Sequence, residues 1–158
     1  MGASPRHAAC TDPRIVAERV SIDGALGPHA WIVEDEPAAA LLAADLCEAN
    51  GAVASVFRLP LAFLSALRAG PAPAVVILDW RLESELSAAL FLSTRHQYPH
   101  LPIIFWTGSG TDALPSMIQD NGYTRVVDKA AGNAPFEEAL AWALTDELRP
   151  MLGSVPAL

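Results

Sequence analysis

Four apolar segments of this chain run into side chains that can bind a cation or act on a phosphate group. Glu34 and Asp35 follow the first segment, and Asp79, Thr107 and Lys129 end or follow the other three. Three carboxylates that converge in one crevice repel one another and raise one another's pKa unless a cation neutralises them. Hard oxygen ligands in an open, partly hydrated cluster suit Mg²⁺, which binds few protein ligands, several waters and a phosphate oxygen. These residues therefore predict a magnesium site with room for a phosphate oxygen, and the single lysine of the chain beside it.

The segments that must position these side chains alternate between strand-like and helix-like patterns, which is typical of an α/β fold with a largely parallel sheet. Ligands of such a sheet bind outside the carboxyl ends of its strands, so side chains at those ends are expected to meet. Apolar runs predict strands over residues 30–33, 52–57, 74–79, 102–106 and 125–128. Helical spacing and breakers predict helices over residues 37–50, 61–69, 85–97, 112–121 and 136–148.

Composition favours one compact domain. The chain has 158 residues, of which 52% are hydrophobic and 18% charged, enough for one buried core. We expect an N-terminal extension over residues 1–29, a domain over 30–148 and a tail over 149–158. The apolar runs are far shorter than a membrane-spanning helix, and a formal charge of −8 argues against a nucleic-acid surface. No secretory signal is evident, so a cytoplasmic location is expected. Cys47 is expected to be a buried free thiol.

The four segments together resemble the receiver domains of bacterial response regulators, over about residues 30–148. The stretch from Trp31 to Pro37 is similar to the acidic first-strand motif of that family, and the stretch from Val75 to Asp79 to its phosphoacceptor strand. The segments 103–108 and 126–129 are similar to its hydroxyl and lysine motifs. Each motif is weak alone, whereas the four in this order at strand ends are specific.

The resemblance implies a flavodoxin-like fold, with five parallel strands in the order 2-1-3-4-5 and helices on both faces of the sheet. It implies that Asp79 accepts a phosphoryl group, that the Thr107 hydroxyl and Lys129 bind this group, and that Mg²⁺ is the cofactor. The metal ligands would be Asp35, Asp79 and the backbone carbonyl of Arg81, with Glu34 binding through water.

The partners that the resemblance implies are a histidine kinase or phosphotransfer protein and an unidentified downstream target. A homodimer is left open. The protein would be a single-domain signalling protein and not an enzyme, beyond catalysing its own phosphorylation and dephosphorylation.

Several positions depart from the family pattern. Ala130 stands where proline usually follows the lysine, and because a cis bond before a residue other than proline costs about 2.5–4 kcal/mol, we expect a trans bond with altered placement of the lysine. After Asp79, Glu83 replaces the usual proline and Ser87 the usual glycine. Val126 replaces the aromatic switch residue, so coupling between a threonine and an inward-turning aromatic ring is not expected.

Two other functions stay open at this point. The departures are compatible with a degenerate receiver that serves only as a protein-interaction module, independently of phosphorylation. A phosphatase with an aspartate nucleophile is disfavoured, because that class has a second acid two residues after the nucleophile and Arg81 stands there.

Overall fold

The computed structural model describes residues 27–80, 87–108 and 122–145, and strands and helices alternate in it up to residue 107. Prolines begin or nearly begin three of the helices, as their fixed backbone angle favours. The elements are β1 (His29–Val33), α2 (Pro37–Ala49), β2 (Val53–Phe57), α3 (Pro60–Ala69), β3 (Val75–Leu78), α4 (Ser87–Gln97), β4 (Ile103–Thr107), β5 (Thr124–Asp128), the 3-10 helix η3 (Lys129–Ala131) and α6 (Ala134–Ala143).

The five strands form one parallel sheet in the order β2-β1-β3-β4-β5. This confirms the predicted fold class and strand order. All four residues of β3 and all five of β4 are buried, as expected for strands covered on both faces. β2 and β5 are the two edge strands of this sheet, and β5 is more exposed than the central strands.

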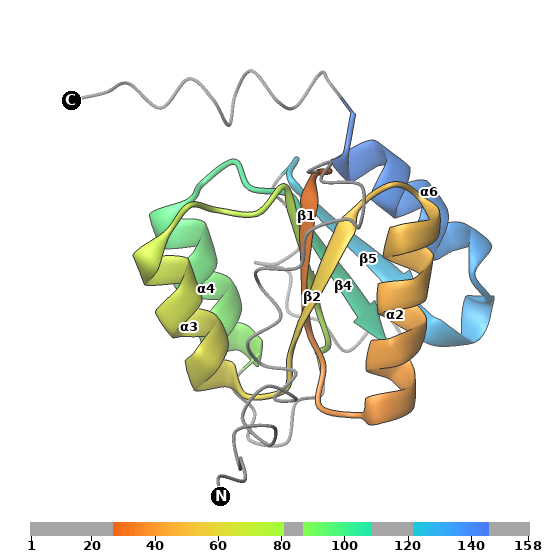
Figure 1. Ribbon diagram of the computed structural model, residues 1–158, viewed down its shortest axis with the longest axis horizontal. Coiled ribbons are helices and arrows are strands. Elements are labelled where there is room, and N and C mark those ends of the chain that lie inside the picture. The colour runs from red at the N-terminus through yellow and green to blue at the C-terminus, as the bar shows by residue number, and fades with distance from the viewer. Residues whose placement is uncertain (1–26, 81–86, 109–121, 146–158) are drawn as a thin grey trace, which may run out of the picture.

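The described helices cover both faces of the sheet. Figure 1 shows α2 and α6 on one face and α3 and α4 on the other. Each pair encloses its own apolar core: one contains Ile32, Ile104, Trp106 and Phe136, and the other contains mainly aromatic and leucine side chains around Phe105. Cys47 is fully buried and free, as predicted, and burial raises the pKa of its thiol to about 12. None of the described helices is long and apolar enough to cross a membrane.

Most of the predicted boundaries are within two residues of those observed, but the predicted end of the last helix, residue 148, is wrong. It ends at Ala143, with Leu144 as its C-cap, and does not continue through residue 145 toward the predicted end. The Thr145 amide and hydroxyl both donate hydrogen bonds to the Trp142 carbonyl, at 3.3 and 2.9 Å, which tightens the chain out of the α-helical pattern. The helix predicted over residues 112–121 lies outside the described residues, and the division into extension, domain and tail stays a prediction.

Candidate functional site

Three carboxylates meet at the carboxyl edge of the sheet. Val33 of β1 is in register with Leu78 of β3, so the residues that follow these two strands are neighbours. The Asp79 amide donates a hydrogen bond to the Val33 carbonyl at 3.1 Å. As a result, carboxylate oxygens of Glu34, Asp35 and Asp79 all lie within 4.8 Å of one another.

Glu34 is the most enclosed of the three acids, with 2% of its surface exposed. Its Oε1 accepts a hydrogen bond from the Glu36 amide at 3.1 Å, and its Oε2 accepts one from Lys129 Nζ at 2.6 Å. Burial raises the pKa of Glu34 above its ordinary value, and the negative charge of Asp79 raises it further, although Lys129 partly opposes the shift. The ionised form of this carboxylate is therefore costly without a neighbouring cation.

Lys129 directly follows β5, which is two strands away from β3 in the sheet, and its side chain extends to the acids. Its backbone begins the 3-10 helix η3, where the Asp128 side chain caps the turn by accepting a hydrogen bond from the Ala130 amide at 2.8 Å. Lys129 Nζ lies 2.6 Å from Glu34 Oε2 and 3.9 Å from Asp79 Oδ1. Among the described residues the cis peptide bond is Gly70–Pro71, so the bond before Ala130 is trans, as expected, and the lysine still reaches the acids.

Two buried residues with hydroxyl groups, Thr107 and Ser87, belong to this edge of the sheet or to the helix that contacts it. Thr107 ends β4 and is fully buried. It is paired in register with Asp128, the residue before Lys129, so it lies at the same edge of the sheet. Ser87, the first residue of α4, is also buried, and its hydroxyl donates a hydrogen bond to the Asp79 carbonyl at 2.7 Å. Ser87 drew notice in the sequence only because it replaces a glycine, and the spacing contains no signal that its hydroxyl holds the backbone of Asp79.

Other residues noted in the sequence have other roles in the structure or lie outside its described part. Glu36, within the acidic motif, is the N-cap of α2 and accepts hydrogen bonds from the Ala38 and Ala39 amides. Val126 is partly buried and packs against the core of the α3 and α4 face. Arg81, whose carbonyl is a predicted metal ligand, and Glu83 lie outside the described residues.

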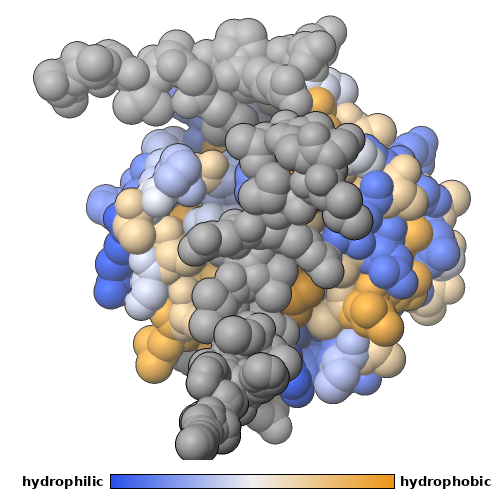
Figure 2. Space-filling view, in the orientation of Figure 1, coloured by the Kyte–Doolittle hydropathy of each residue, from blue (hydrophilic) through white to orange (hydrophobic). Residues whose placement is uncertain are grey.

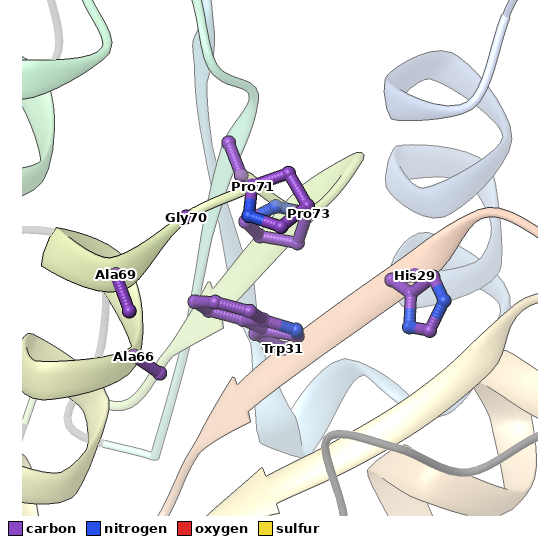
Figure 3. Close-up of a pocket in the computed structure, with 8 residues that line it drawn as sticks. His29, Trp31, Ala66, Ala69, Gly70, Pro71 and Pro73 are labelled. Atoms are coloured by element: carbon purple, nitrogen blue, oxygen red, sulfur yellow. The ribbon is translucent and has the colours of Figure 1, made fainter.

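A pocket of about 390 Å³ lies away from this edge, at the amino end of β1. Figure 3 shows Trp31 in it between the alanines of α3 and the prolines of the following loop, with His29 to one side. His29 is the only titratable side chain of its lining, so the pocket does not hold the chemistry predicted from the sequence.

The acidic group at the carboxyl edge has the chemistry of a hard-cation site. It offers carboxylate oxygens and no sulfur or imidazole, from residues that differ in burial, Asp35 being partly exposed and the other two buried. Oxygen ligands with room for water are those that Mg²⁺ prefers. The described residues thus fit a magnesium ion, which Glu34, Asp35 and Asp79 would hold.

Comparison by sequence finds no family model and no curated protein that matches. Comparison by structure finds several similar proteins. A response regulator receiver domain protein from Clostridium thermocellum has a TM-score of 0.68 at 18% identity, over 79% of this chain and 98% of the other.

A CheY-like receiver domain protein from Methanospirillum hungatei has a TM-score of 0.69 at 16% identity, over 80% of this chain and 99% of the other. The response regulator TrrA from Thermotoga maritima, described in complex with Mg²⁺ and BeF, has a TM-score of 0.64 at 19% identity, over 74% of this chain and 99% of the other. The chain therefore has the fold of the response regulator receiver domains.

Proposed function

We propose that the protein is a signalling receiver in which Asp79 accepts a phosphoryl group from a phosphohistidine, with Mg²⁺ bound beside it. The observation that carries this proposal is the convergence of three carboxylates within 4.8 Å with the ammonium of Lys129 at 3.9 Å from Asp79. A structural role does not need so much buried charge, because buried acids and lysines cost free energy unless a ligand or partner compensates them.

In the proposed step, one carboxylate oxygen of Asp79 attacks the phosphorus of the phosphohistidine. The phosphorus–nitrogen bond breaks, its electron pair stays on the imidazole nitrogen, and a mixed anhydride of aspartate and phosphate is formed. Such a transfer needs little proton transfer from the protein and much neutralisation of charge on the phosphoryl oxygens.

The residues around Asp79 divide this task. Bound Mg²⁺ would supply positive charge to the phosphoryl oxygens. Lys129 is a mobile point charge that can turn from Glu34 toward an incoming phosphoryl oxygen. Thr107 has a hydroxyl at the same edge that can donate a hydrogen bond to it. Ser87 keeps the backbone of Asp79 in place through its carbonyl, and this limits the movement of the nucleophile.

A protein donor would dock on the surface beside this edge. Large apolar side chains are exposed in the first two turns of α2 and at the start of α3, namely Leu41, Leu42, Leu59 and Leu61, with exposed fractions of 64, 39, 47 and 75%. The segment that carries Leu59 and Leu61 follows the carboxyl end of β2, at the edge that holds Asp79. Figure 2 shows hydrophobic surface in the lower part of both flanks. Exposed apolar side chains close to a phosphoacceptor favour contact with a kinase or phosphotransfer protein.

Small phosphodonors test the proposal without a known kinase. Acetyl phosphate with Mg²⁺ should label the wild-type protein on Asp79, as located by mass spectrometry, and should fail to label Asp79→Asn or the wild type in EDTA. Beryllofluoride should bind with the same dependence on Mg²⁺ and should alter tryptophan fluorescence. Absence of both label and saturable fluorescence change would refute the proposal and favour a phosphorylation-independent interaction module, whereas steady turnover of phosphate esters would favour a phosphatase.

A further inference from the structure

The ammonium of Lys129 lies over an aromatic ring as well as beside the acids. Its Nζ is 5.1 Å from the centroid of the Trp106 indole, within the distance at which a cation is attracted to the face of the ring. Trp106 is 3% exposed, and the ring of Phe136 in α6 packs against it with centroids 4.9 Å apart. A Cβ atom at Gly108 would lie 4.0 Å from Lys129 Cδ, so the stem of the lysine passes close to the backbone after β4. The lysine therefore lies against the end of β4.

Packing alone does not account for an indole at this position. Trp106 Nε1 is buried and has no hydrogen-bond partner among the described residues, whereas most buried indole N–H groups have one. An apolar side chain could fill this core without leaving a buried donor unsatisfied. What the indole adds is its large, electron-rich face, which meets the single lysine of the chain.

The ring matters for Lys129 because its other contacts are the acids Glu34 and Asp79, which a bound cation would also attract. The backbone of η3 is held by Asp128, but four flexible carbons separate it from the ammonium. If Glu34 bound a cation, Lys129 would lose the contact at 2.6 Å and would keep its contact with the ring. The ring face attracts positive charge and accepts hydrogen bonds only weakly, so it competes little with a phosphoryl oxygen for the ammonium protons.

We propose that Trp106 is a positioning residue. Its indole face holds the ammonium of Lys129 beside the three acids, where the ammonium can contact the phosphoryl group. This inference rests on the proposed function of Asp79. It differs from a general packing role because it requires the effect of Trp106 to pass through Lys129.

The contact can be measured without any reaction. Because Lys129 is the only lysine, protein grown with ¹³C-labelled lysine gives one set of lysine side-chain signals. The ring current of Trp106 should shift the signals of the Lys129 ε-methylene protons upfield. The shift should disappear in Trp106→Leu, remain in part in Trp106→Phe, and be unchanged in the control Trp142→Leu, which removes a ring that faces Arg125 instead. Wild-type signals at the position of a solvent-exposed lysine would overturn the proposal, even if Trp106→Leu does not fold.

The effect on phosphorylation is tested by a double-mutant comparison. With Lys129 present, Trp106→Leu should slow labelling of Asp79 by acetyl phosphate about tenfold, and Trp106→Phe should slow it less, since phenylalanine attracts a cation more weakly than tryptophan. In the Lys129→Met background, the same substitutions should leave the remaining rate nearly unchanged. Equal slowing in both backgrounds would show that Trp106 acts by packing and would overturn the proposal. A wild type that shows the lysine shift but no label would refute the function of Asp79 instead, and with it the positioning role.

Discussion

Replacing Lys129 with methionine should destabilise the metal-free protein by an amount that depends on pH. Methionine keeps much of the length and apolar surface of the lysine stem and removes its charge. The substitution leaves Glu34, which is 2% exposed, without the partner 2.6 Å away, while the carboxylate of Asp79 remains close to it. The loss is therefore mainly that of an uncompensated buried charge.

The size of the loss is limited by how easily Glu34 takes up a proton. At an effective dielectric constant of about 20, the attraction between Lys129 and Glu34 at 2.6 Å is about 6 kcal/mol. Keeping a carboxyl with an ordinary pKa of 4.5 protonated at about pH 7.5 costs only about 4 kcal/mol, which sets the upper limit. Because burial already raises the pKa of Glu34 in the wild type, part of this cost is present before the substitution, and we expect a loss of about 3 kcal/mol. At about pH 5.5 the same proton costs about 1.4 kcal/mol, so the loss should fall to about 1 kcal/mol.

Urea unfolding followed by circular dichroism, in EDTA at both pH values, measures this difference. Excess Mg²⁺ should recover much of the stability at the higher pH, because its charge compensates the same carboxylates and ligand binding to the folded state stabilises it. In a Glu34→Gln background, Lys129→Met should cost less than about 1 kcal/mol. Arg125→Met is a matched control, since this exposed cation lies 4.5 Å from the Trp142 ring, and its loss should be small and independent of pH.

An equal loss at both pH values would refute this reasoning. So would an undiminished loss when residue 34 is glutamine, because either result means that Lys129 stabilises the fold by packing and not by compensating Glu34.

Three further outcomes are expected. Glu34→Gln should stabilise the metal-free protein at neutral pH and lose this advantage as the pH falls toward 4.5. An acid whose pKa is raised binds its proton more tightly in the folded state, so the wild type loses stability as the pH rises above 4.5. Urea titrations at several pH values measure the difference in stability between the two proteins, and a difference that does not change with pH would contradict this prediction. Ser87→Ala should lower the free energy of unfolding by about 1–2 kcal/mol and weaken beryllofluoride binding, because the buried Asp79 carbonyl loses its donor at 2.7 Å; unchanged values in both assays would contradict the assigned contact. In a Cys10→Ser variant, the Cys47 thiol should react with Ellman's reagent only as fast as the protein unfolds. The reason is that this thiol is fully buried and its pKa is raised to about 12. Rapid reaction of the native protein would count against this burial.

The elements and the edge that holds the acids could be predicted from the sequence because their signals are local. Apolar runs such as residues 75–78 and 103–106 predict buried parallel strands, and prolines and glycines predict where helices begin and end. Once the strands are parallel, residues just after them share one edge, so Glu34, Asp35, Asp79, Thr107 and Lys129 could be grouped before any coordinates were known. The end of α6 was less predictable, because the hydrogen bonds that the Thr145 hydroxyl and amide donate end the helix without any change in the spacing of apolar residues.

The pairing of side chains at that edge was decided by the tertiary structure. Lys129 and Glu34 are 95 residues apart, and only the assembly of the sheet makes them partners at 2.6 Å, closer than the lysine is to Asp79. The same holds for the Ser87 hydroxyl on the Asp79 carbonyl and for the Trp106 face under the lysine. Local sequence determines where the chain is extended, helical or turned and therefore which strand end carries each functional group. Distances of a few ångströms between such groups depend on how helices and strands distant in sequence pack together, and no spacing along the chain encodes them.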